Sequence, residues 1–210
     1  MTVLLTNLRN AVLTGIALTA VVLAIYLSLN DGALVGDAFW PFMLRWLHVV
    51  CGIMWIGILW YFNFVQIPTM PKIPDELKPA VGRFIAPEAL FWFRWAAMGT
   101  LAFGVFLAAL KPGGLLIDAY TLDAGNGFSN PSVVIIGLGM WMGTIMWFNV
   151  WFVIWPNQQK ALNIGNAHAS LSAEEKAKSA KKAGLFSRVN TVLSFPMLFC
   201  MVASPHIITG

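Results

Sequence analysis

Two histidines, His48 and His206, lie in apolar parts of the sequence, where an ionisable side chain needs a function or a polar partner. His48 interrupts the continuous apolar segment 39–61, and His206 follows Pro205 near the end of the chain. Ionisable side chains at membrane depth are costly, and most of them face a partner, a cofactor or a water-filled cavity. Two neutral imidazoles from different helices can ligate a haem iron axially, and imidazoles also bind copper. We therefore expect haem b at this pair, with copper left open.

The residues around His48 recur at helical spacing. Gly52 lies about one turn after His48, Trp55 lies about one turn further, and Arg45 lies about one turn before it. This spacing predicts an imidazole, a gap for a flat macrocycle and an aromatic wall on one helix face. Arg45 would pair with haem propionates or would extend to the lipid headgroups. The alternatives are an interhelical hydrogen bond for His48 and a solvated helix end for His206.

A second group of polar residues lies toward the other ends of the expected helices. Its members are Asn63, Gln66, Arg94, Asn149, Arg188, Asn190 and Thr191. Such a cluster could bind an anionic or amide-bearing ligand, or a quinone headgroup. It could equally join helices by hydrogen bonds, a role well suited to Asn and Thr in bilayers. The second interpretation is the one we favour from the sequence.

The composition is that of an integral membrane protein. Hydrophobic residues make up 59% of the 210 residues, charged residues make up 10%, and the mean hydropathy is +0.74. At about 20 residues for each spanning helix, the sequence predicts an all-α bundle of about five transmembrane helices. The expected spans are residues 10–30, 41–64, 89–110, 132–155 and 189–209. Residues 1–210 are interpreted as one domain.

Basic residues indicate an orientation, because Lys and Arg accumulate in cytoplasmic loops. The second and fourth connections carry most of them, whereas the first carries Asp31 and Asp37. The N-terminus is therefore predicted in the cytoplasm and the C-terminus on the outer side. The net charge of +4 then reflects topology in a lipid bilayer, and nucleic-acid binding is not expected.

The connections and the small residues carry further signals. Ser172 and Glu175 form a capping box that predicts a short helix over residues 173–184. Gly139 and Gly143 form a small-xxx-small pair, which is typical of close helix contacts. Prolines after the second span predict an extended connection packed against the bundle. They are Pro68, Pro71, Pro74, Pro79 and Pro87.

Three segments, residues 45–57, 146–160 and 188–206, resemble the membrane domain of cytochrome-fused bacterial urate oxidases, also called membrane urate hydroxylases. The resemblance implies a multi-pass protein of the bacterial inner membrane with redox chemistry and a c-type cytochrome as partner, so the outer side predicted for the C-terminus is the periplasm. The residues that stand in the matching segments are His48, Trp55, Gly57, Asn149, Trp155, Pro156, Asn157, Gln158, Arg188, Asn190, Thr191, Pro196 and His206.

The two cysteines, Cys51 and Cys200, form no C-x-x-C-H motif, so a covalently bound c-type haem is not expected in this sequence. The leading hypothesis is a membrane redox protein that binds haem b through His48 and His206 and passes electrons to a separate c-type cytochrome or larger complex. One alternative is a cofactor-free structural subunit of a respiratory or photosynthetic membrane complex. Another is a complete urate-oxidising enzyme, so enzymatic activity stays open.

Overall fold

The structure is a computed structural model, and it describes residues 7–29, 39–111 and 115–206, with side chains described as far as Ser204. These residues are helical apart from short connections, and no strand occurs among them. The chain divides into two compact units, Met1–Met43 and Leu44–Gly210, which are described separately. The interpretation of residues 1–210 as one domain stays a prediction.

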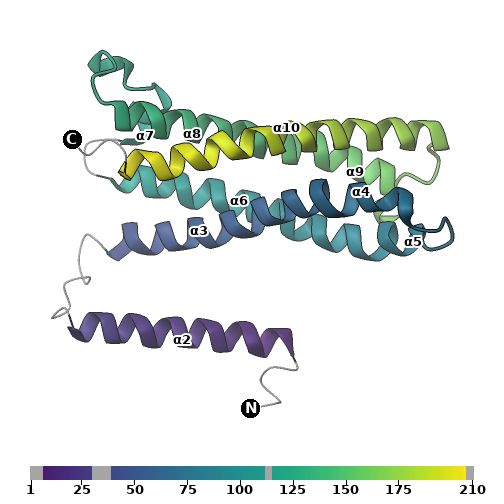
Figure 1. Cartoon of the computed structure of the whole chain (residues 1–210), viewed down its shortest axis with the longest axis horizontal. Coiled ribbons are helices and arrows are strands. Elements are labelled where there is room, and N and C mark those ends of the chain that lie inside the picture. The colour runs from purple at the N-terminus through teal and green to yellow at the C-terminus, as the bar shows by residue number, and fades with distance from the viewer. Residues whose placement is uncertain (1–6, 30–38, 112–114, 207–210) are drawn as a thin grey trace. The chain divides into compact units, whose positions relative to one another are not determined.

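Helix α2 (Leu8–Leu29) makes up most of the described part of the first unit (Figure 1). It carries no charged residue after Arg9 and has no buried residue. Its 22 residues are long and apolar enough to cross a membrane. A helix of this length and apolar composition suits a lipid environment.

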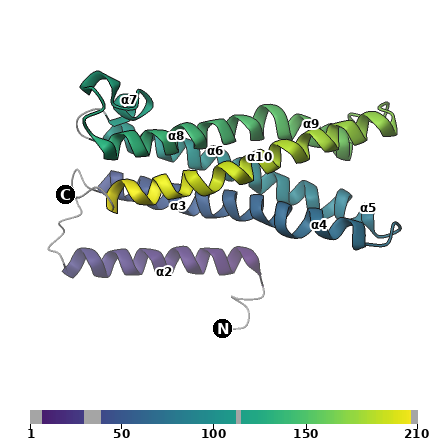
Figure 2. The same cartoon turned by 45° about the horizontal axis from the view of Figure 1, so that its top comes forward.

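Four long helical segments make up the second unit, and Figures 1 and 2 both show them side by side with alternating directions. Each is long and apolar enough to span a membrane, so the expected number of five spanning helices is confirmed by length and composition. The first contains α3 (Phe39–Trp60), the π-helix η1 (Tyr61–Gln66), α4 (Ile67–Thr69) and η2 (Met70–Lys72), and the second contains α5 (Lys78–Ala80), the π-helix η3 (Val81–Ile85) and α6 (Ala86–Leu110). The connection to the third segment contains α7 (Leu115–Tyr120) and η4 (Ala124–Asn126). The third segment contains α8 (Pro131–Phe148), the π-helix η5 (Asn149–Ile154) and α9 (Trp155–Leu162). The fourth segment is α10 (Ala173–His206), which follows η6 (Ile164–Asn166).

This unit has two ends, the histidine end and the proline end. The histidine end contains His48, the last turns of α6, α7, the first turns of α8 and the last turns of α10. The proline end contains η1 to η3, η5, α9 and the first turns of α10 (Figure 1). Between them lies a core whose fully buried side chains include Trp55, Leu59, Phe93, Met146 and Val150.

Most prolines at the proline end lie within helices, so the expected extended connection is wrong. The helix that begins at Phe39 continues to Lys72 and the next begins at Lys78, which leaves residues 73–77 as the connection. A proline ring normally clashes with the carbonyl four residues earlier. Each of the three π-helices ends two residues before a proline, and the wider π turn relieves this clash. The prolines concerned are Pro68, Pro87 and Pro156.

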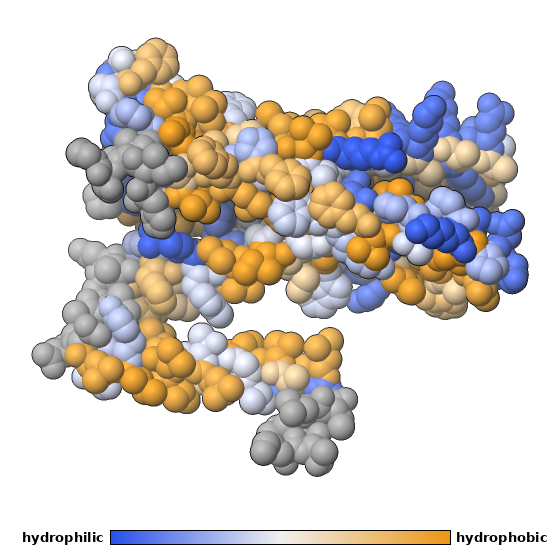
Figure 3. Space-filling view, in the orientation of Figure 1, coloured by the Kyte–Doolittle hydropathy of each residue, from blue (hydrophilic) through white to orange (hydrophobic). Residues whose placement is uncertain are grey.

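The capping box at the start of α10 is confirmed. The Ser172 backbone N–H donates to Glu175 Oε2 at 2.8 Å, and the Glu175 N–H donates to Ser172 Oγ at 3.2 Å. The separate short helix over 173–184 is wrong, because α10 continues without a break to His206. Hydrophilic residues gather over α9 and the first turns of α10, whereas hydrophobic residues cover the middle of the unit (Figure 3).

The glycines of α8 differ in their surroundings. A Cβ atom at Gly139 would lie 2.9 Å from the Cβ atom of Cys200, so α10 packs directly on this position. A Cβ atom at Gly143 would have no neighbour within 4 Å. The expected small-xxx-small pair is therefore reduced to one close contact, at Gly139.

Candidate functional site

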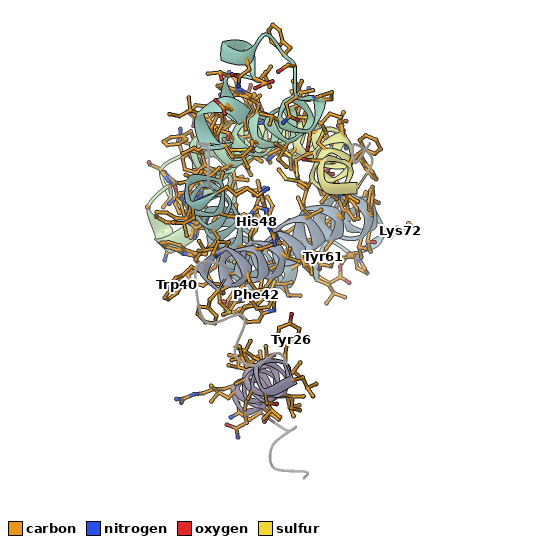
Figure 4. The ribbon with its side chains drawn as sticks, turned by 90° about the vertical axis from the view of Figure 1, so that its left-hand side faces the viewer. Tyr26, Trp40, Phe42, His48, Tyr61 and Lys72 are labelled. Carbon is orange, nitrogen blue, oxygen red and sulfur yellow. The ribbon has the colours of Figure 1, made fainter. Side chains whose placement is uncertain are left out.

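His48 is hydrogen-bonded to the backbone of α6. Its Nδ1 atom lies 2.8 Å from the Thr100 carbonyl oxygen. A carbonyl oxygen only accepts hydrogen bonds, so Nδ1 carries the proton and Nε2 keeps a lone pair. Figure 4 shows His48 on the side of α3 that faces the other helices of the unit. The imidazole is thus held in one tautomer, with Nε2 as an available donor atom for a metal.

Two glycines of α6 make room for the side chains of α3. A Cβ atom at Gly104 would lie 2.9 Å from both Cε1 and Nδ1 of His48. A Cβ atom at Gly99 would lie 2.8 Å from Cys51 Sγ. Both distances are too short for real carbon contacts, so a larger residue at either position would push the α3 side chains away. The glycines therefore fix how closely the His48 ring approaches α6.

The three residues predicted to accompany His48 lie in different surroundings. Trp55 is 1% exposed and belongs to the core, and its indole Nε1 has no hydrogen-bond partner among the described residues. A Cβ atom at Gly52 would lie 3.9 Å from Thr100 Cγ2, which is ordinary van der Waals contact, so α6 covers this side of Gly52. Arg45 is exposed.

His206 is the last residue of α10, and its side chain lies outside the described residues. The pairing of His48 with His206 therefore stays a prediction. Among the described side chains, no group of three or more His, Cys, Asp or Glu residues could hold a metal ion. On that part of the chain, His48 offers a single imidazole donor, which is a common proximal ligand of haem iron.

Two asparagines of the predicted polar cluster form a buried pair. The Asn149 side-chain amide donates to Asn190 Oδ1 at 2.8 Å, and the Asn190 amide donates to the Met146 carbonyl oxygen at 2.9 Å. Asn149 is 6% exposed and Asn190 is completely buried. This pair ties the junction of α8 and η5 to α10, as expected for polar residues that join helices.

The other members of the cluster lie in separate contacts. The Asn63 amide donates to Ser187 Oγ at 2.8 Å and to the Leu59 carbonyl oxygen at 2.9 Å. The guanidinium carbon of Arg94 lies 3.3 Å from the ring centroid of Trp155. Arg188 is exposed. The structure therefore joins Asn149 with Asn190 but does not bring all seven residues of the predicted cluster to one site.

Two serines of α10 belong to the same polar contacts and were not predicted from the sequence. Ser187 accepts the Asn63 hydrogen bond, and Ser194 Oγ accepts one from Trp60 Nε1 at 3.0 Å. Both are buried, as is Asn190 between them. Their spacing of three and then four residues places all three on one helix face. This polar periodicity in an apolar helix is the signal that could have identified them.

A family whose description is urate oxidase N-terminal matches residues 113–209. The match includes α7, α8, η5, α9 and the whole of α10, and it contains the segments 146–160 and 188–206. The segment 45–57 with His48 lies outside it. No curated protein matches the chain, and no solved structure matches it. Residues 113–209 are thus a urate oxidase N-terminal-like domain, and the family resemblance expected from the sequence is confirmed.

Proposed function

We propose that the chain is a redox protein of the bacterial inner membrane, related to urate oxidases, that binds haem b through His48 Nε2. Electrons would pass to a separate c-type cytochrome or a larger complex. The observation that supports this most directly is the hydrogen bond from His48 Nδ1 to the Thr100 carbonyl oxygen. Metal-ligating histidines usually donate their second ring N–H to a backbone carbonyl or a carboxylate, which fixes the tautomer and makes the ligating nitrogen more basic.

The residues around His48 are compatible with ligation of a haem iron by Nε2, but they restrict where the haem ring could lie. The imidazole is in the correct tautomer, and the exposed Arg45 side chain is available for a propionate. Because α6 covers Gly52, the macrocycle would lie elsewhere around His48. His206 would be the candidate for a second haem ligand. Haem would supply one-electron redox chemistry, while the protein orients the imidazole and excludes water.

A cofactor-free structural subunit is the second candidate, and the same contacts favour it. The His48 hydrogen bond satisfies one ring nitrogen without any ligand, and Thr100 closes the side of Gly52. In this proposal the exposed apolar helix faces bind lipid and other membrane subunits. Urate oxidation is a further candidate activity, because residues 113–209 match the urate oxidase N-terminal family.

A dithionite-minus-oxidised visible spectrum of the full chain in mild detergent tests the haem proposal, with iron and copper quantified on the same sample. We expect a b-type band and about one iron for each chain. His48→Ala should abolish the band. His168→Ala is the matched control, because this histidine lies in the connection between α9 and α10, and it should leave the spectrum unchanged. His206→Ala should convert a low-spin spectrum to a high-spin one if His206 is the second ligand.

The outcomes separate the candidate functions. An unchanged spectrum in His48→Ala would remove His48 as the ligand. A featureless spectrum without metal, after expression with added haem precursor, would favour the structural subunit. Copper in place of iron, lost on substitution of His48, would identify a copper site. Urate-dependent reduction of added cytochrome c by the loaded protein would extend the function to urate oxidation.

A further inference from the structure

A cavity of about 130 Å³ lies at the proline end of the four-helix unit. Most of its wall is apolar and includes Phe62, Phe93 and Ile154. Its size is close to that of a cavity that accommodates one benzene ring. No charged side chain stands among the described residues that line it. The cavity therefore suits a neutral ligand with a single six-membered ring.

Two polar atoms at the cavity have unused hydrogen-bonding capacity. Gln66 lines it, and its Oε1 atom is buried without a hydrogen-bond partner among the described residues. Ser187 also lines it, and its hydroxyl accepts a hydrogen bond from the Asn63 amide. Buried polar groups are rarely left without a hydrogen bond, so the unpaired Gln66 Oε1 atom at a cavity indicates a missing ligand or water.

The hydrogen bonds of Asn63 determine the role of Ser187. The Leu59 carbonyl oxygen requires a donor, so the Asn63 amide nitrogen is correctly placed. That nitrogen donates one hydrogen to Leu59 and the other to Ser187 Oγ. The Ser187 O–H hydrogen is therefore free, since it has no acceptor among the described residues. The cavity thus offers an acceptor at Gln66 and a donor at Ser187, and Gln158 is the third polar residue that lines it.

We propose that this cavity binds the ring of a lipid-soluble hydroquinone. A phenolic hydroxyl donates one hydrogen bond and accepts others, so one such group could donate to Gln66 Oε1 and accept from Ser187 Oγ. The ring would contact Phe62 and Phe93. An anion would find no cation, and a heterocycle with polar groups on every edge would leave them against apolar walls. The helices around the cavity can span a membrane, which favours a ligand that enters from lipid.

The proposal is independent of haem at His48, and calorimetric titration of the full chain in detergent tests it. The probe is decylhydroquinone, a hydroquinone ring with one alkyl chain and no other substituent, kept reduced under anaerobic conditions. The matched ligand is its dimethyl ether, which has the same apolar body and no hydroxyl donor. We expect saturable binding of the hydroquinone and only micelle partitioning of the ether. Gln66→Leu and Ser187→Ala should each weaken binding roughly three- to tenfold, as expected for one hydrogen bond.

A cavity-filling variant locates the binding. Gly184 lines the cavity, and a Cβ atom there would have no neighbour within 4 Å, so Gly184→Leu should abolish binding. Gly57→Leu is the matched control, because Gly57 is exposed with equally open space and lies outside the cavity wall. Thermal unfolding shows whether Gly184→Leu folds. If it does not fold, weaker binding to Gln66→Leu still tests whether the ligand lies in the cavity.

Several results would overturn the proposal. Equal binding to wild type and Gly184→Leu would place the ligand outside the cavity. Equal binding of the hydroquinone and its ether would reduce the effect to partitioning. No saturable binding to the folded wild type would mean that the cavity holds water only. His48→Ala should bind the probe normally, so loss of haem and loss of hydroquinone binding are separate observations.

Discussion

The two ends of the four-helix unit achieve close helix packing in different ways. At the histidine end, Gly104 and Gly137 let neighbouring segments approach until only a hydrogen fits at each position. At the proline end, π turns widen the helices, and side-chain amides and aromatic rings join them. The close contacts at these two glycines leave little space, whereas the side-chain contacts of the proline end leave the cavity lined by Gln66 and Ser187. The histidine end is thus suited to hold one imidazole precisely, and the proline end to admit a small ligand.

The largest loss of stability is expected from a substitution that disrupts the packing of the histidine end. A Cβ atom at Gly137 would overlap the Ala119 carbonyl oxygen, which is backbone and cannot rotate away. Gly137→Ala should therefore displace α7 and lower the free energy of unfolding by about 1–3 kcal/mol. Gly143→Ala, in the same helix with no neighbour within 4 Å, should cause no loss. Thermal unfolding in detergent measures both, and equal losses would refute the difference between these positions.

The second prediction tests whether side-chain amides stabilise the contact between helices at the proline end. Asn190→Leu leaves the buried Asn149 amide without its acceptor and the Met146 carbonyl without this donor. We expect a loss of about 0.6–2 kcal/mol in the free energy of unfolding. The double variant Asn149→Leu with Asn190→Leu removes both partners and should recover part of that loss. A double variant as unstable as the sum of the two single variants would show that the amides act independently.

The third prediction, with a smaller loss of stability, tests the cation–π contact of Arg94 at the proline end. Arg94 lies over Trp155 and also near Trp151, with 5.7 Å between the guanidinium carbon and the second ring centroid. Arg94→Met keeps much of the apolar contact and removes the cation, so stability should fall by about 0.5–1 kcal/mol. Arg188→Met, at an exposed position, is the control and should stay within about 0.5 kcal/mol of wild type. A similar loss in both variants would assign the effect to overall charge.

The sequence predicted well those features that depend on composition or on local hydrogen bonds. Five helices able to span a membrane follow from apolar length alone. The capping box at Ser172 and Glu175 follows from two residues at fixed spacing. His48 was expected to face a partner, and it contacts Thr100 and Gly104 of α6. These features require no knowledge of how distant segments are aligned.

The features that the sequence did not predict lie mainly at the proline end. Proline was interpreted as a helix breaker, whereas π turns accommodate Pro68, Pro87 and Pro156 inside helices. One extra residue in a turn rotates the following residues by about 100° around the helix axis. Ordinary helical spacing therefore fails across η1 and η5. For this reason the contact of Asn63 with Ser187 could not be predicted from the sequence. Arg188 lies two residues before Asn190 in the uninterrupted helix α10, so ordinary helical spacing already places it on another face.

The smallest expected effect concerns a loop at the histidine end, outside the spanning helices. Asp123, which is 2% exposed and has a left-handed backbone, accepts hydrogen bonds from the Asn126 side-chain amide and the Asn130 backbone N–H, each at 2.8 Å. These donors, with the Ser129 N–H, hold the pKa of the Asp123 carboxyl below its ordinary value. The charged form therefore stabilises the loop above the ordinary carboxyl pKa of about 3.9, and this contribution is lost as the pH falls through the lowered pKa of the folded state.

Limited digestion with pepsin across the acid range measures this loss in the loop over residues 121–130. Cleavage should increase as the pH falls below about 4, after correction for the pH dependence of the protease on an unfolded substrate. Asp123→Asn keeps a residue type that tolerates the left-handed conformation but cannot accept two hydrogen bonds as a carboxylate does. It should raise cleavage at every pH and flatten the profile, whereas Asp118→Asn, in α7, should keep the wild-type profile. An unchanged profile in Asp123→Asn would mean that backbone packing alone holds the loop, as it holds Gly137 against Ala119 at the same end.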